Sequence, residues 1–184
     1  MRLTSLSPPI RLLNNVMAFT HSAGWQPNFG GILKSVGEGG TYGALCVRYG
    51  SEFERDISSE WFDSETDFCF DSASISVPSL FNHSVPIGTS SAARKFANAV
   101  FPNSTIERVD GGLFGTIKLS SSDPLQSAVA SMIKKGALRF SSGSAMQFVK
   151  RVGGHIIKWK ILELSMTPQA AEFRLPKIRQ LTTN

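Results

Sequence analysis

"SSDPLQSAVASMIKKGA", residues 121–137, contains the clearest helical pattern in this chain of 184 residues. Asp123 is suited to cap the N-terminus, Pro124 fits the first helical position, and Gly136 fits the left-handed residue after the end. Apolar residues recur at helical spacing and would form one stripe facing a core: Leu125, Ala128, Val129, Met132 and Ile133. The stretch therefore predicts an amphipathic helix packed on a larger hydrophobic core.

Strand-like segments lie on both sides of this helix. Residues 106–120, "IERVDGGLFGTIKLS", predict a hairpin that turns at residues 110–112. Residues 137–152 and 155–168 predict strands, the second because β-branched and aromatic residues fill it until Pro168.

The upstream part of the chain carries shorter patterns. They are a Gly-rich hairpin (29–50), an acidic aromatic segment with a helical turn capped by Ser58 or Ser59 (51–68), a strand running into the loop of His83 (72–84) and a short helix (91–101). An order of strands, helix and strands predicts an α+β domain built on a mostly antiparallel sheet or barrel.

Length and composition indicate a single domain. The chain is 41% hydrophobic, enough for one sizeable core. Residues 1–28 have no clear periodicity and predict an extended or loosely ordered arm. No apolar run approaches the ~18 to 20 residues of a membrane span, and Pro8 and Pro9 make the N-terminus a poor signal peptide. We expect a cytosolic protein in which Cys46 and Cys69 are buried free thiols.

The net charge of +5 is unevenly distributed. Residues 1–117 hold eight Lys and Arg against eleven Asp and Glu, whereas residues 118–184 hold eleven against three. Such a basic part can bind nucleic acid or an acidic protein, or it can simply be a solvated face. Nucleic-acid-binding motifs are missing from the sequence, so the solvated face is the preferred interpretation.

Candidate catalytic residues are serines and histidines. "RFSSGSAMQF", residues 139–148, places Ser141, Ser142 and Ser144 around one glycine after the predicted helix. A serine nucleophile needs a base, and only His21, His83 and His155 exist. The sequence lacks GxSxG, HExxH, P-loop and GxGxxG motifs, which leaves hydrolysis by a separated Ser, His and acid, or no catalysis.

Five segments in order resemble the tailed-phage (caudovirus) prohead proteases, also called head maturation proteases. They are "GGILKSVGEGGTYGALCVRYG" (30–50), "RDISSEWFDSETDF" (55–68), "LFNHSVPIGT" (80–89), "GALRFSSGSAMQFV" (136–149) and "GHIIKWKILELSMTPQAAEFR" (154–174). The resemblance covers about residues 29–174. It implies a serine endopeptidase related in fold to the herpesvirus assemblins, a β-barrel flanked by helices.

The resemblance also implies catalytic roles. The Ser-x-Gly of the family aligns with Ser141, Ser142 and Gly143, which makes Ser141 the expected nucleophile. The family usually has an apolar residue between the serine and the glycine, whereas this chain has Ser142 there. Ser142 is therefore an alternative nucleophile, and Ser144 is a weaker one.

The other members of the expected triad come from the same resemblance. His83 is the expected base and Glu163 the expected acid, with His155 as the alternative third member because assemblins use a second histidine. Glu163 of "KWKILEL" could also serve only as an ion-pair partner of Lys158 or Lys160 across a sheet. Backbone N–H groups near Arg174 are the expected donors to the oxyanion.

The expected substrates are the major capsid protein, a scaffold protein, or both, cleaved inside the assembling prohead in the host cytoplasm. Self-cleavage and self-association are further expectations, and the basic C-terminal part would suit an acidic scaffold. No cofactor, metal, membrane or specific nucleic acid is expected. The protease domain is placed at residues 29–176, followed by a tail at 177–184.

Two other functions stay open. One is a catalytically silent structural or scaffold-like component with the same fold. The other is a basic protein packaged with the genome, which would bind DNA with a strong salt dependence.

Overall fold

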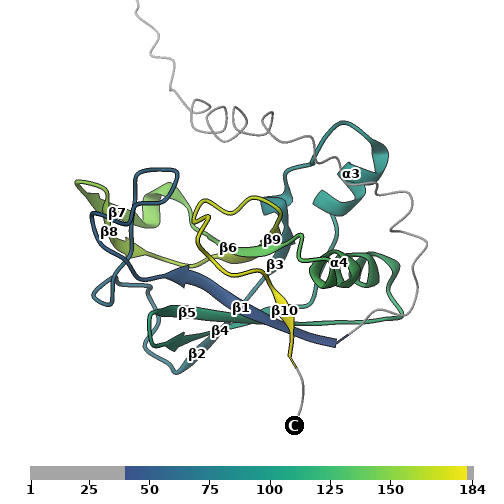
Figure 1. Ribbon diagram of the computed structural model, residues 1–184, viewed down its shortest axis with the longest axis horizontal. Helices are drawn as coiled ribbons and strands as arrows, with labels where there is room; N and C mark the ends of the chain where they lie inside the picture. Colours follow the sequence, from purple (N-terminus) through teal and green to yellow (C-terminus); the bar gives the residue numbers. More distant parts are fainter. Residues whose placement is uncertain (1–39, 182–184) are drawn as a thin grey trace, which may run out of the picture.

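The computed structural model describes residues 40–181. These residues form an α+β fold with mostly antiparallel sheets and few helices (Figure 1). The strands are β1 (Gly40–Arg48), β2 (Ser74–Val77), β3 (Ser79–Phe81), β4 (Ser104–Val109), β5 (Gly112–Leu119), β6 (Arg139–Gly143), β7 (Val149–Val152), β8 (His155–Trp159), β9 (Glu163–Thr167) and β10 (Arg179–Gln180). The helices are α3 (Ser91–Ala97) and α4 (Pro124–Lys134), with short 3-10 turns η1 (Asn82–Ser84) and η2 (Met146–Phe148).

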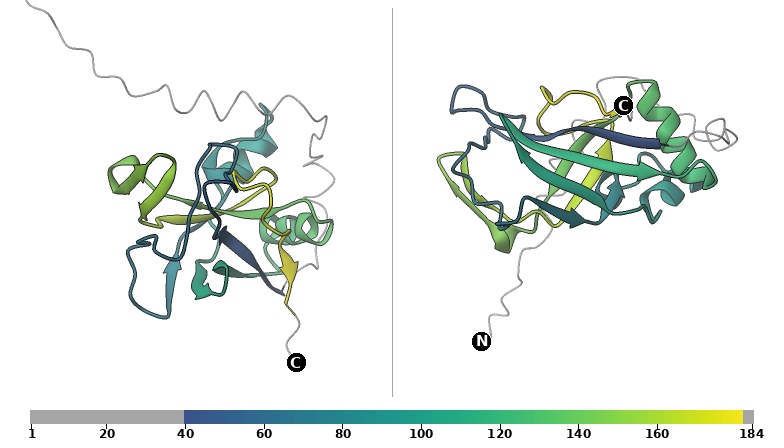
Figure 2. Two further views of the ribbon diagram at one scale, coloured as in Figure 1. Left: turned by 60° about the vertical axis from the view of Figure 1, so that its left-hand side comes forward. Right: turned by 90° about the horizontal axis from the view of Figure 1, so that it is seen from below.

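The larger sheet has five strands in the order β10-β1-β5-β4-β2, all antiparallel. Its longest strands, β1 and β5, run side by side, with α4 near one end in the right-hand view of Figure 2. The β4–β5 hairpin confirms the prediction for residues 106–120, and Gly111 takes a φ of 79° in its turn. The first strand of the hairpin predicted for residues 29–50 lies outside the described residues.

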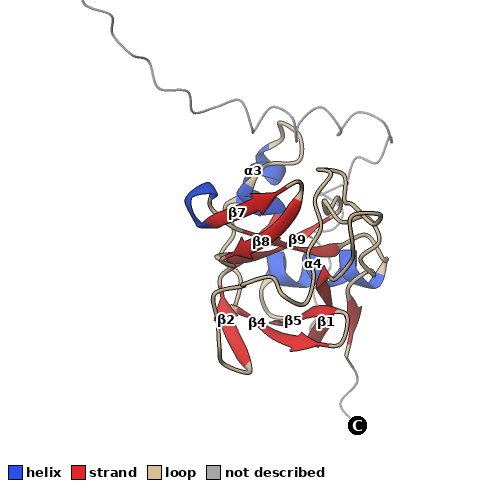
Figure 3. Ribbon diagram, turned by 90° about the vertical axis from the view of Figure 1, so that its left-hand side faces the viewer, coloured by secondary structure: helices blue, strands red, loops and turns tan. Residues whose placement is uncertain are grey.

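A three-stranded sheet, β3-β9-β6, forms a second layer over the larger sheet (Figure 3). β9 lies in its centre, parallel to β3 and antiparallel to β6. Strands β7 and β8 form a separate antiparallel pair. The described strands thus form three open sheets, so the expectation of a closed barrel is not met.

The two layers meet in one core. Leu164 of β9 and Phe140 of β6 are fully buried and lie against Gly115 of β5, where a side chain would collide with Leu164. Helix α4 packs on this core as predicted. Asp123 caps it by accepting from the N–H groups of Leu125 and Gln126, and Gly136 follows it with a φ of 66°.

Three other predictions need correction. Residues 51–68 form turns rather than the expected helical turn. The tail placed at 177–184 is partly inside the fold, because Ile178 is buried and β10 pairs with β1. Cys46 is buried as predicted, which raises the pKa of its thiol to about 12, but Cys69 is exposed. The arm at 1–28 lies outside the described residues.

Candidate active site

Strand β9 presents one polar face, and that face carries the candidate acid. Leu164 and Met166 are fully buried in the core. Because successive side chains of a strand point to opposite faces, Glu163 and Ser165 lie on the other face. The sequence "ELSMT" alternates polar and apolar residues to match these two faces, although Ser165 and Thr167 on the polar face are buried too.

The register of β6 on β9 separates the two candidate nucleophiles. Ser141 lies directly opposite Ser165, whereas Ser142 lies opposite Leu164. Residues directly opposite in an antiparallel pair share a face of the sheet. Ser141 is therefore on the face of Glu163, and Ser142 on the face that packs toward the larger sheet.

His83 reaches this face from an unusual turn after β3. Asn82, His83 and Ser84 have φ angles of 50°, 55° and 58°, all in the left-handed region. This region is unfavourable for residues other than glycine, and a run of three is found only where the surroundings enforce it. The turn aims the imidazole back at β9.

The His83 ring is joined to Glu163. Its Nδ1 lies 2.6 Å from Glu163 Oε1, and the imidazole remains 39% exposed while the carboxylate is 15% exposed. A carboxylate on Nδ1 fixes the tautomer in which Nδ1 carries the proton and Nε2 is the basic nitrogen. This is the arrangement of a general base with an orienting acid.

Gly143 makes room for the acid. It lies opposite Glu163 in the register, and a Cβ built on it would lie 1.8 Å from Glu163 Oε1. Glycine is therefore required two residues after Ser141 because the Glu163 carboxylate occupies the space over its Cα. The Ser-x-Gly pattern thus has a steric explanation in this fold.

One contact of a complete triad is not formed. Among the described residues, Ser141 Oγ makes no hydrogen bond with His83, and His83 Nε2 has no hydrogen-bond partner. Catalytic hydrogen bonds are often long without substrate and tighten when it binds. The structure brings together His83, Glu163 and the β6 face of Ser141, while the Ser141 hydroxyl and His83 are not hydrogen-bonded.

His155, the alternative third member, belongs to another cluster. Its ring stacks on Trp61 with centroids 5.2 Å apart, and Arg55 covers the same indole at 4.4 Å. His155 Nε2 lies 2.8 Å from Asp63 Oδ2, although its N–H is not aimed well enough for a hydrogen bond. This histidine is held by Trp61 and Asp63 and not by the residues around His83. His21 lies outside the described residues.

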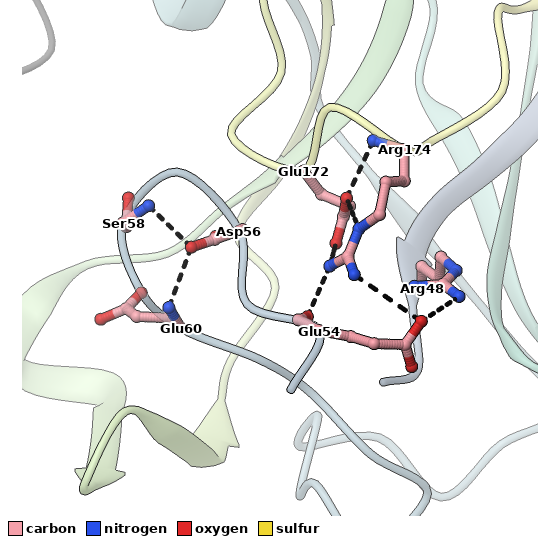
Figure 4. A network of polar contacts seen from close by, with 7 residues as sticks. All are labelled: Arg48, Glu54, Asp56, Ser58, Glu60, Glu172 and Arg174. Atoms are coloured by element: carbon pink, nitrogen blue, oxygen red, sulfur yellow. Dashed lines mark hydrogen bonds and ion pairs between the residues drawn. The ribbon is translucent and has the colours of Figure 1, made fainter. Parts of the chain in front are cut away.

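Arg174 belongs to a charged network between two loops (Figure 4). Its guanidinium binds the Glu172 carboxylate and the Glu54 carbonyl, and Arg48 donates to Glu54 at 2.7 Å. Burial alone would raise the pKa of Glu172, but the hydrogen bonds from Arg174 outweigh it and lower the pKa. The Arg174 N–H also donates to Glu172 Oε1 at 2.9 Å, so the expected oxyanion donor is already occupied.

Three site residues were not predicted from the sequence. Ser165 bonds both His83 and Glu163, while Asn82 and Thr167 hold the turn of His83. The available signal was the alternation of "ELSMT", which puts residues 163, 165 and 167 on one face. This pattern could not show that the face of β9 lies beside residue 82, because the parallel pairing of β3 with β9 joins positions about 80 residues apart.

Compared with models of protein families, with curated proteins and with solved structures, the chain gives no match. Within residues 40–181, His, Cys, Asp and Glu side chains nowhere gather in a group of three that could hold a metal ion. None of the described helices is long and apolar enough to span a membrane.

Proposed function

We propose that this protein is a serine endopeptidase of phage head maturation, with Ser141 as nucleophile, His83 as base and Glu163 as orienting acid. The observation that carries the proposal is the bond from His83 Nδ1 to Glu163 Oε1, which leaves Nε2 basic on the sheet face of Ser141. The resemblance to prohead proteases of the assemblin-like fold supplies the substrate class.

The proposed reaction follows from these positions. Ser141 Oγ attacks the carbonyl carbon of the scissile peptide bond while its proton passes to His83 Nε2. Glu163 stabilises the resulting imidazolium, which then gives the proton to the leaving amine as the C–N bond breaks. Water, deprotonated by His83, hydrolyses the acyl-enzyme and regenerates Ser141.

The unpaired edge of β6 is suited to bind an extended peptide substrate. The backbone N–H of Leu164 points toward β3, where it donates to the Pro78 carbonyl. Backbone groups alternate in direction along a strand, so those of Ser165 point toward β6 and pair with the backbone of Ser141. The N–H and C=O groups of Phe140 and Ser142 therefore point away from β9, where none of the described strands pairs with β6. An extended chain added along that edge would pass beside Ser141.

The test is co-expression with the major capsid protein of the same phage. Wild type is expected to shorten the capsid protein, as measured by mass spectrometry, whereas Ser141→Ala is expected to leave it intact. Ser142→Ala is the matched control, because this neighbouring hydroxyl faces the other side of β6, and it should retain cleavage. Processing by Ser141→Ala would remove Ser141 from the mechanism.

A catalytically silent, scaffold-like component is the second candidate. The observation that favours it is the missing hydrogen bond between Ser141 and His83 in the described structure. It predicts that the wild type leaves the capsid protein, any scaffold protein and itself at full length, while the chain still joins the assembling particle.

A further inference from the structure

Ser165 links the two charged partners of the site through one hydroxyl group. Its side chain is fully buried on the polar face of β9. Its Oγ donates to Glu163 Oε2 at 2.8 Å and accepts from the backbone N–H of His83 at 2.9 Å. One small side chain therefore contacts both the acid and the main chain of the base.

The acid needs this second contact to keep its orientation. Glu163 Oε1 binds His83 and Oε2 binds Ser165, so each oxygen has its own partner. The terminal torsion of glutamate is broad, and on the Gly143 side there is no Cβ to hold the carboxylate. Without the Ser165 hydroxyl, the carboxylate could rotate away from Nδ1.

The base needs the same hydroxyl for a different reason. His83 is the middle residue of three in the left-handed region, which persists only when contacts enforce it. Ser165 holds its N–H, while Thr167 Oγ1 donates to Asn82 Oδ1 at 2.8 Å and the Asn82 amide donates to the Val85 carbonyl at 2.8 Å. Two side chains of β9 thus clamp the turn.

We propose that Ser165 is a positioning residue that sets the Glu163 carboxylate and the His83 main chain together, so that Nε2 stays directed to the face of Ser141. The inference rests on the proposed function for its kinetic consequence. The geometric claim, that the His83–Glu163 bond depends on Ser165, holds without it.

The chain offers a matched control for a simple loss of stability. Ser104 of β4 is also fully buried, and its hydroxyl shares a hydrogen bond of 2.7 Å with Ser79 of β3. Ser104→Ala therefore removes one buried hydroxyl, as Ser165→Ala does, without touching the site.

The kinetic experiment measures the rate at which diisopropyl fluorophosphate modifies the full chain. Ser165→Ala is expected to lower this rate about 10- to 100-fold, the loss of a hydrogen bond to a charged group. Ser165→Thr keeps the hydroxyl and should recover most of the rate. Ser104→Ala should react at nearly the wild-type rate, although thermal unfolding should show that it is destabilised. If Ser165→Ala does not fold, Ser165→Cys replaces it, since it keeps the size and loses the strong donor.

A second readout does not depend on activity. The Nδ1–H proton of His83, identified by its absence from His83→Gln, is followed by NMR. It should persist in wild type, Ser104→Ala and Ser165→Thr, and shift or disappear in Ser165→Ala or Ser165→Cys. A wild-type signal and a wild-type rate in those last variants would overturn the inference. A wild type that neither reacts nor cleaves would defeat the proposed function instead, and the signal alone would then decide whether Ser165 positions the pair.

Discussion

Residues 40–181 contain two histidine–carboxylate pairs, and they differ in which ring nitrogen faces the carboxylate. His83 gives Nδ1 to Glu163 and keeps Nε2 free on a half-exposed ring. His155 instead has Nε2 2.8 Å from Asp63 Oδ2, without a hydrogen bond, and its ring is stacked on Trp61. The first pair leaves the second ring nitrogen open on the sheet face of Ser141, whereas in the second pair Nε2 lies beside a carboxylate and the ring takes part in packing. A carboxylate beside a histidine therefore does not identify a base; the nitrogen that remains free does.

The largest expected difference between the pairs comes from removing each histidine. His83→Gln should reduce peptide cleavage by about 10⁴-fold, because the general base and the tautomer-fixing contact are both lost. His155→Gln should change the cleavage rate less than about threefold and mainly lower stability. Rates on the capsid protein, with thermal unfolding of each variant, provide the measurement. Equal losses of activity would mean that His155 belongs to the site.

The next largest effect should come from the two acids. Glu163→Gln keeps the size of the side chain but reverses the preferred tautomer of His83, so cleavage should fall about 10²- to 10⁴-fold. Asp63→Asn, its counterpart beside His155, should leave cleavage nearly unchanged. Full activity in Glu163→Gln would show that the Glu163 carboxylate is not needed to orient His83.

Two glycines beside the pairs give a smaller, steric comparison. A Cβ on Gly143 would overlap the Glu163 carboxylate, so Gly143→Ala should lower cleavage about 10²-fold by displacing it. A Cβ on Gly154 would meet Arg55 and the Ser59 carbonyl, and Gly154 has a φ of 95°. Gly154→Ala should therefore destabilise the fold while the folded fraction stays active. Urea unfolding measured together with cleavage rates separates the two results.

The smallest effect concerns pH and the loop that leads to Asp63. Burial raises the pKa of Asp56, despite hydrogen bonds from the N–H groups of Glu60 and Ser58. A raised folded-state pKa means that the stability contributed by Asp56 is greatest below its unfolded pKa and declines as pH rises through the folded value. Asp56→Asn keeps an acceptor oxygen and should raise the unfolding free energy at pH 7 by less than about 1 kcal/mol.

A second carboxylate of this region should respond to pH in the opposite direction. The pKa of Glu172 is lowered, so the stability that it contributes is present above its unfolded pKa and is lost as pH falls through the folded value. Glu172→Gln should destabilise at pH 7 and have little effect in acid. Urea unfolding of both variants at pH 4 and pH 7 tests the two signs, and an unchanged Asp56→Asn at both would contradict the role of burial.

The sequence predicted the elements whose signals are local. Helix α4 has its cap, its apolar stripe and its terminal glycine within 14 residues, and the β4–β5 hairpin has its turn between two strands. The layers were not predictable in this way. Whether strands close into a barrel depends on pairing between distant segments, and the parallel contact of β3 with β9 leaves no local pattern.

The site was predictable only in part for the same reason. His83, Glu163 and Ser141 came from a family resemblance, and their roles stay predictions. Ser142 could be set apart from Ser141 only through the register of β6 on β9. The left-handed turn at His83 contains no glycine, so the sequence gives no sign of it. The contact that holds this turn comes from the buried hydroxyl of Ser165 on another strand.

The most direct test of the central claim is to map the serine that diisopropyl fluorophosphate modifies. Digestion and mass spectrometry of the treated protein should place the adduct on Ser141 in wild type and in His155→Gln. The adduct should be absent from Ser141→Ala and from His83→Gln. An adduct on Ser142, or one on Ser141 that forms equally well without His83, would contradict the account.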